Sequence, residues 1–131
     1  MTYLELEKEL GGFYNTDGSK AERFVLNSFP EPYAIDGPGF YGIHNPDLTL
    51  VRGKNYFFRY SYHENLVTHP FLIKSEQSSS TSGTYDKGVV YSGEEVISNY
   101  VFFIVPMDAP DTLYYNCEFH IDETGILHIV D

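Results

Sequence analysis

From residue 33 onward, short apolar runs alternate with turn-forming residues. The clearest run is 55–62, in which every second residue from position 56 is a tyrosine or phenylalanine, as expected for a strand with one buried face. No amphipathic helix long enough to cover a parallel sheet interrupts these runs. The pattern therefore predicts an all-β protein, an antiparallel sandwich of about 7–8 strands. The predicted strands are 33–35, 48–51, 55–62, 71–74, 89–91, 100–105, 112–117 and 126–130.

The first 32 residues follow a different pattern. Thr2 and Glu5 match a helix capping box, and apolar residues share one helical face up to a Gly-Gly pair, which predicts a short helix at 2–10. Residues 12–32 mix Gly, Asn, Asp, Ser and Pro and predict an irregular arm. We therefore expect a helix and arm at 1–32 and a sandwich at 33–131 that folds without them.

This N-terminal segment has two interpretations. A nine-residue helix is marginal in water, so its apolar stripe should pack against something. The segment is a candidate docking element for a protein partner or for assembly into a virion. Equally, the arm could fold back across the edge of its own sandwich.

Composition and charge exclude several classes of partner. The chain has 131 residues, enough for one domain, and an aromatic content of 17% that favours β structure. With 19 acidic and 8 basic residues, the net charge of −11 would repel nucleic acid and anionic membranes. The acidic N-terminus does not resemble a signal peptide, and no apolar run is long enough to span a bilayer. We expect synthesis in the cytosol.

The lone cysteine is the residue that most needs an explanation. Cys117 cannot form an internal disulfide, so it is a buried thiol, a ligand or a reactive group. Cys117 and His120 lie where a predicted strand runs into a loop, which allows thiol and imidazole to converge. His69 begins another predicted strand, and two histidines with one thiolate form the trigonal set of copper electron-transfer sites. Sequence spacing alone does not bring His69 to the other two.

Three segments together resemble the plastocyanin-type cupredoxins. They are 45–58 (NPDLTLVRGKNYFF), 69–74 (HPFLIK) and 105–120 (VPMDAPDTLYYNCEFH), and the resemblance covers about residues 33–131. It implies a Greek-key sandwich in which His69, Cys117 and His120 ligate copper through imidazole nitrogen and thiolate sulfur. The three side chains should then lie within a few ångströms of one another at one end of the sandwich, with or without metal.

The sequence departs from the family at the fourth ligand. In the family a weak ligand, most often Met, follows the second histidine, but here the loop after His120 contains neither Met nor Gln. Glu123 could reach in, and a hard carboxylate would produce a four-ligand tetrahedral site suited to zinc or to copper of low potential. If Glu123 stays in solvent, an intensely coloured copper site is expected. Pro70 also offers no N–H to the cysteine sulfur.

Two functions follow from these residues. The first is a copper-binding module, with zinc or no metal as alternatives, in which electron transfer is the expected use. The second is a structural or interaction protein, such as a capsid decoration or tail component of a virion. The missing Met and missing export signal favour this second reading, and modules of this kind resemble those attached to proteins of marine phage particles.

An enzyme is not expected. The carboxylates form no acid–base pair, the serines at 78–80 lack the glycines of a nucleophile elbow, and no glycine-rich loop joins a strand to a helix. His44, His63 and His128 lie outside the matched positions and are expected to be surface or hydrogen-bonded histidines.

Overall fold

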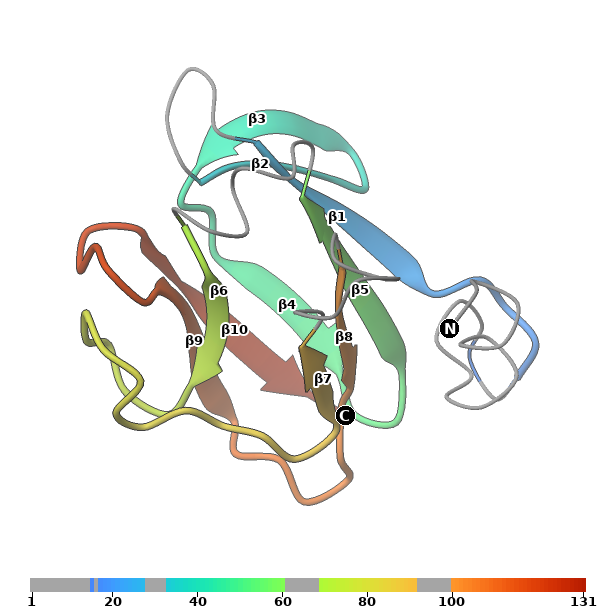
Figure 1. Cartoon of the computed structure of the whole chain (residues 1–131). Coiled ribbons are helices and arrows are strands. Elements are labelled where there is room, and N and C mark those ends of the chain that lie inside the picture. Colours follow the sequence, from blue (N-terminus) through green and yellow to red (C-terminus); the bar gives the residue numbers. More distant parts are fainter. Residues whose placement is uncertain (1–14, 16, 28–32, 61–68, 92–99) are drawn as a thin grey trace.

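The computed structural model describes residues 15, 17–27, 33–60, 69–91 and 100–131 (Figure 1). Within these residues there are ten strands and no helix, and hence none with the length and apolarity that crossing a membrane requires. The strands are β1 (Glu22–Asn27), β2 (Ala34–Gly37), β3 (Phe40–His44), β4 (Leu48–Val51), β5 (Asn55–Tyr60), β6 (Phe71–Lys74), β7 (Val89–Tyr91), β8 (Tyr100–Ile104), β9 (Thr112–Cys117) and β10 (Thr124–Val130).

These strands form two sheets. One has six strands in the order β3-β2-β1-β5-β8-β7, and the other has four in the order β4-β10-β9-β6. The all-β class predicted from the sequence is confirmed, and all eight predicted strands are present, four with the predicted ends and four with shifted ends. Two strands were not predicted, β1 and β3. In β3 the side chains are mostly exposed, so the strand lacks the alternation that would have marked it.

Two strand pairings correct the antiparallel prediction. β1 runs parallel to β5, and β4 runs parallel to β10. The other pairings between named strands are antiparallel. A parallel pair needs a long connection rather than a hairpin, and here each connection includes at least one strand of the other sheet. The period-2 pattern of a half-buried strand is the same in both directions, so it does not show the direction of its partner.

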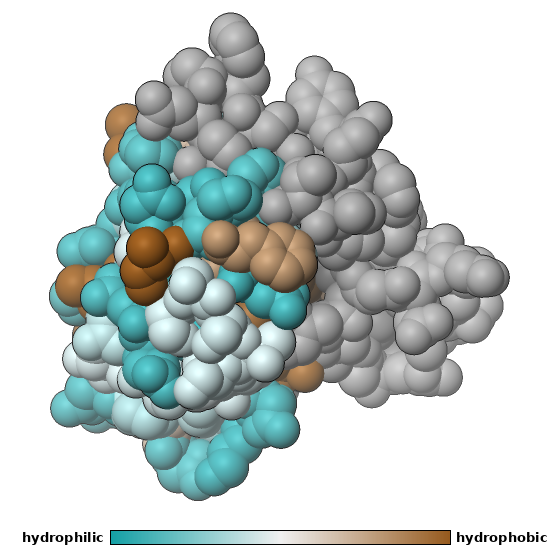
Figure 2. Space-filling view, turned by 60° about the vertical axis from the view of Figure 1, so that its left-hand side comes forward, coloured by the Kyte–Doolittle hydropathy of each residue, from teal (hydrophilic) through white to brown (hydrophobic). Residues whose placement is uncertain are grey.

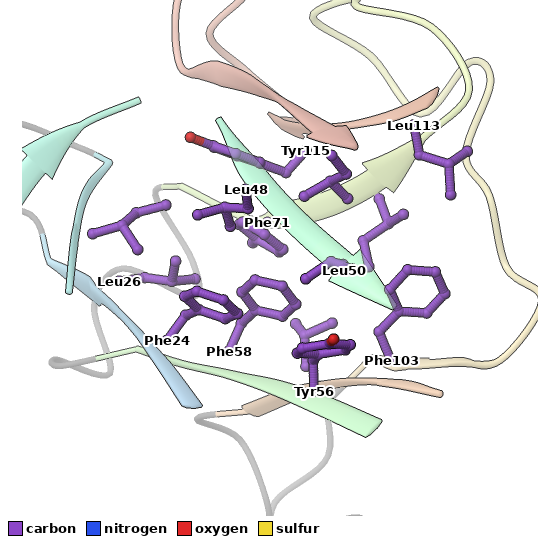
Figure 3. Packing of buried hydrophobic residues seen from close by; sticks show 14 of the residues in the cluster. Phe24, Leu26, Leu48, Leu50, Tyr56, Phe58, Phe71, Phe103, Leu113 and Tyr115 are labelled. Atoms are coloured by element: carbon purple, nitrogen blue, oxygen red, sulfur yellow. The ribbon is translucent and has the colours of Figure 1, made fainter. Parts of the chain in front are cut away.

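The core lies between the two sheets and is strongly aromatic. Figure 3 shows Phe24 and Phe58 of the six-stranded sheet facing Phe71 and Tyr115 of the four-stranded sheet. The rings of Phe58 and Phe71 approach to 4.7 Å between centroids, which joins the two sheets directly. Each buried aromatic side chain removes about 150–250 Å² from water, so this layer supplies much of the stability of the domain.

The prediction of an irregular arm is wrong for residues 22–27. These residues form β1, which lies between β2 and β5 inside the six-stranded sheet. Phe24 and Leu26 point into the core. The apolar run is too short, and too closely flanked by turn residues, to be recognised as a strand. The sandwich therefore begins before residue 33, and we expect a chain lacking residues 1–32 to lose its fold. The predicted helix at 2–10 lies outside the described residues, and its docking role stays a prediction.

Substitutions in β1 test whether this strand belongs to the core. We expect Leu26→Ala to lower the free energy of unfolding by about 2–5 kcal/mol, because it leaves a cavity at a fully buried position. Arg23→Ala, on the exposed side of the same strand, should change it by no more than about 0.5 kcal/mol. Urea unfolding followed by circular dichroism measures both. Equal small effects would show that residues 22–27 do not pack in the core.

Candidate metal centre

The pairing of β6 with β9 brings the candidate ligands together. Phe71 lies opposite Cys117 in this antiparallel pair, so the start of β6 meets the end of β9. The pairing continues for one further bond, from the N–H of Glu118 to the carbonyl of Pro70, 3.1 Å away. His69, the residue before Pro70, is thereby held against the loop that follows Cys117. This proximity is the one that the sequence spacing did not reveal.

Four side chains converge at this end of the four-stranded sheet. One nitrogen, sulfur or oxygen atom from each of His69, Cys117, His120 and Glu123 lies within 4.8 Å of the others. The Cys117 Sγ lies 3.4 Å from Nδ1 of His120 and 3.9 Å from Nδ1 of His69. The expected convergence of His69, Cys117 and His120 is thus confirmed. Their service as metal ligands stays a prediction.

Glu123 lies inside the cluster rather than in solvent. Its Oε1 is 2.6 Å from Nδ1 of His69, and its Oε2 is 3.4 Å from Nδ1 of His120. The carboxylate therefore faces the same ring nitrogens that face the sulfur. Of the two alternatives that the sequence left open for this residue, the structure selects the one in which Glu123 reaches in.

Only one of the four side chains is substantially open to water. Cys117 is fully buried and is part of the hydrophobic core. The His69 side chain is 19% exposed, whereas that of His120 is 45% exposed. Phe119 and Ile121, on either side of His120, are exposed large apolar residues. Figure 2, which brings the left-hand side of the view in Figure 1 forward, shows hydrophobic residues among hydrophilic and intermediate ones on the described part of the surface.

A buried tyrosine supports the histidine side of the cluster. The Tyr33 hydroxyl donates a hydrogen bond to the backbone carbonyl of His69 at 2.6 Å. Its ring meets that of His69 edge-on at a centroid distance of 6.5 Å. Burial, together with the nearby Tyr60 and Cys117 groups, raises the pKa of Tyr33 well above its ordinary value. Tyr33 therefore remains a neutral donor that fixes the backbone at His69.

The sulfur environment favours the thiol over the thiolate when no cation is bound. Burial raises the pKa of Cys117 to about 11, and the N–H of Phe119, which donates to Sγ at 3.5 Å, opposes this only in part. Glu123 raises the pKa further because its charge repels that of a thiolate. A buried thiol of this kind is a poor nucleophile, and a bound cation is the natural means of ionising it.

The donor set fits a single metal ion. Bonds of about 2.0–2.3 Å to a tetrahedral ion place neighbouring donor atoms about 3.3–3.7 Å apart. Three of the observed separations lie close to this range. Nδ1 of His120 is 3.4 Å from the Cys117 sulfur and 3.4 Å from a Glu123 oxygen. The Cys117 sulfur is 3.9 Å from Nδ1 of His69. His69 and Glu123 are closer, at 2.6 Å, because they share a hydrogen bond. That pair would have to move apart by about 1 Å to admit an ion.

The other histidines do not join the cluster. His128 lies 3.5 Å from Asp47, and both side chains are exposed. His44 is an exposed residue at the end of β3, and His63 lies outside the described residues. In the described part of the chain, the four-residue cluster is the one group of His, Cys, Asp and Glu with spacing suitable for a metal.

Sequence reasoning missed the asparagine that precedes Cys117. Asn116 is fully buried in β9, and its side-chain amide contacts the backbone of the site loop. One signal was present, because Asn is depleted in strands and here stands within an otherwise apolar and aromatic run. An amide at such a position must find hydrogen-bond partners in the fold.

Comparisons with known proteins yield structural neighbours only. No family model matches the chain, and no curated protein does. Reduced rusticyanin is 15% identical, with 98% of this chain and 97% of that chain covered and a TM-score of 0.49. Rusticyanin from Thiobacillus ferrooxidans is 14% identical, with 98% and 94% covered and a TM-score of 0.45. A third neighbour, described as the copper protein rusticyanin, is 13% identical, with 98% and 95% covered and a TM-score of 0.44.

The likeness to these three neighbours is weak. At TM-scores below 0.5 and such identities they do not place the chain in a family, so the functional argument rests on the cluster itself. Neither the comparisons nor the described residues support the virion alternative.

The raised pKa of Cys117 predicts an alkaline loss of stability. In the unfolded chain the thiol ionises near its ordinary pKa of about 8.5. Between this value and about 11, the unfolded chain has lost a proton that the folded chain keeps, so the free energy of unfolding falls as pH rises. Between pH 8 and pH 10.3, the free energy of unfolding of the metal-free protein should therefore fall by roughly 2 kcal/mol more than that of Cys117→Ser.

Urea unfolding in the presence of a chelator at both pH values measures this difference. The shifted tyrosines are common to both proteins, so their contribution cancels. A difference between the two proteins that stays constant across this range would show that burial does not hold the thiol protonated.

Proposed function

We propose that this chain is a non-enzymatic, cupredoxin-type module that binds one copper ion and transfers electrons. The observation that carries the proposal is the cluster of two imidazole nitrogens, one sulfur and one carboxylate oxygen within 4.8 Å at one end of the sandwich. Two histidines and a cysteine are the donor set of copper electron-transfer sites. The sequence motif and the geometry support the same three residues.

Each residue of the cluster has a defined role in this proposal. His69 and His120 would hold the ion through Nδ1, the atom that each directs toward the sulfur. Cys117 would supply the thiolate from within the core. The ion would supply one-electron redox chemistry, and the rigid sandwich would limit rearrangement between oxidation states. His120, whose side chain is 45% exposed, offers the shortest path from the site to a redox partner in solution.

Glu123 would set the reduction potential and the metal preference of the site. A carboxylate is a hard, anionic donor that favours Cu(II) over Cu(I), which lowers the reduction potential relative to a site with a thioether. The same donor makes the set suitable for zinc, which competes for two nitrogens, one sulfur and one oxygen in tetrahedral geometry. We therefore propose copper as the functional ion and zinc as its strongest competitor.

Metal titration tests the proposal directly. We expect the metal-free protein to bind one equivalent of Cu(II) and to compete for it with Zn(II), with visible absorption weaker than that of a purely trigonal site because Glu123 takes part. Cys117→Ser should remove the thiolate-to-copper absorption and keep the fold. His128→Ala, which removes an exposed histidine outside the cluster, should leave both unchanged. Binding no tighter than in Cys117→Ser would overturn the copper assignment.

Replacing the carboxylate tests the role of Glu123. We expect Glu123→Met to raise the reduction potential of the copper-loaded protein by about 60–120 mV, which corresponds to a 10- to 100-fold loss of preference for Cu(II). The visible absorption should intensify at the same time. Glu118→Met, in the same loop but outside the cluster, is the matched control and should shift the potential little. Voltammetry and absorption spectra of the three proteins measure this, and equal potentials would remove Glu123 from the site.

A further inference from the structure

The side chain of Asn116 is buried directly behind the site. It is fully shielded from solvent, and its Nδ2 lies 3.2 Å from the carbonyl oxygen of Cys117. The same nitrogen lies 3.3 Å from the carbonyl oxygens of both His120 and Glu123. One amide group therefore contacts the backbone of three of the four cluster residues.

The segment 117–123 closes on itself around this amide. The N–H of Cys117 donates to the carbonyl of Glu123 at 2.8 Å, and the N–H of Glu123 donates to the carbonyl of His120 at 3.2 Å. The Asn116 amide joins the carbonyls at the beginning, middle and end of the loop. The two ends of the loop are thus joined by a backbone hydrogen bond, and the Asn116 amide binds the carbonyls inside it.

Stability alone does not account for an asparagine at this position. Its Oδ1 is buried and accepts no hydrogen bond within the described residues. An unpaired buried acceptor is unfavourable, and Asn is a poor strand former. The amide has two hydrogens for three carbonyls, two of which already accept a backbone N–H. A β-branched apolar residue would suit strand β9 better.

We propose that Asn116 is a positioning residue that sets the spacing of Cys117, His120 and Glu123 before a metal ion arrives. It acts through their carbonyl groups and does not touch the ion. The consequence for metal binding rests on the proposed function, whereas the hydrogen bonds themselves belong to the metal-free chain. Outer partners of this kind typically contribute 10- to 100-fold to metal affinity.

Asn116→Val separates positioning from stability. The substitution removes the donors and the unpaired acceptor and introduces a good strand former. We expect the metal-free variant to keep the wild-type midpoint of urea unfolding but to bind Cu(II) about 10- to 100-fold more weakly, with altered thiolate-to-copper absorption and copper hyperfine splitting. A merely structural asparagine would shift the unfolding midpoint and leave the spectrum unchanged.

Asn45→Gly is the matched control. The Asn45 amide donates to the carbonyl of Asp122 at 2.7 Å, so it tethers the same loop at a residue outside the cluster. The backbone of Asn45 has a φ of 49°, which glycine adopts without strain. This variant should bind Cu(II) within about twofold of the wild type.

The outcomes distinguish this inference from the proposed function. If the wild type binds Cu(II) and Asn116→Val matches its affinity and spectrum, the positioning role is overturned and the copper proposal stands. If the wild type binds no Cu(II), both fail together. If Asn116→Val does not fold, NMR hydrogen exchange of the Asn116 side-chain amide in the wild type decides. Slow exchange with and without Cu(II) supports the proposal, and protection that appears only with Cu(II) overturns it.

Discussion

The backbone pairing of β6 with β9 is the constraint on which the site depends. Placing Phe71 opposite Cys117 leaves His69 beside the loop after β9, and the bond from Glu118 to Pro70 extends the pairing to the edge of the cluster. A one-residue slip would turn the side chains of β6 to the opposite face. Phe71 and Ile73 are buried in the core, so such a slip would expose them. The hydrophobic core therefore enforces the register that assembles the site.

Core and site meet in Cys117. Its sulfur belongs to the hydrophobic cluster and also faces two imidazole nitrogens. Phe71, which lies opposite Cys117 in the sheet, stacks on Tyr115 at 5.3 Å and meets Tyr33 edge-on at 5.5 Å. A well-packed aromatic layer is difficult to deform. Rigid support of this kind suits an electron-transfer centre, in which the ligands should move little when the charge changes.

Polar groups at this end of the sandwich contact either the side chains of the cluster or the backbone that carries them. Glu123 faces the two histidines, the amide of Asn116 binds the loop that carries Glu123, and Tyr33 fixes the backbone of His69. The cluster is therefore positioned mainly through backbone carbonyls rather than through contacts between neighbouring side chains. In this arrangement the side chain at the fourth position can vary without loss of the geometry of the other three, because backbone hydrogen bonds hold the loop 117–123 and the pairing of β6 with β9 holds His69.

The sequence by itself determined the all-β class and eight of the strands, and its resemblance to the plastocyanin-type cupredoxins pointed to His69, Cys117 and His120. Strong period-2 alternation and turn residues are local signals, which can be recognised along the chain without knowledge of the fold. The tertiary structure alone decided that residues 22–27 enter the six-stranded sheet, that two strand pairs are parallel, and that Glu123 points inward. It also assigned the amide of Asn116 to three carbonyls. Each of these features depends on which distant segment a strand or side chain contacts in the fold. The identity of a residue shows that it can form a hydrogen bond, but it does not show with which partner.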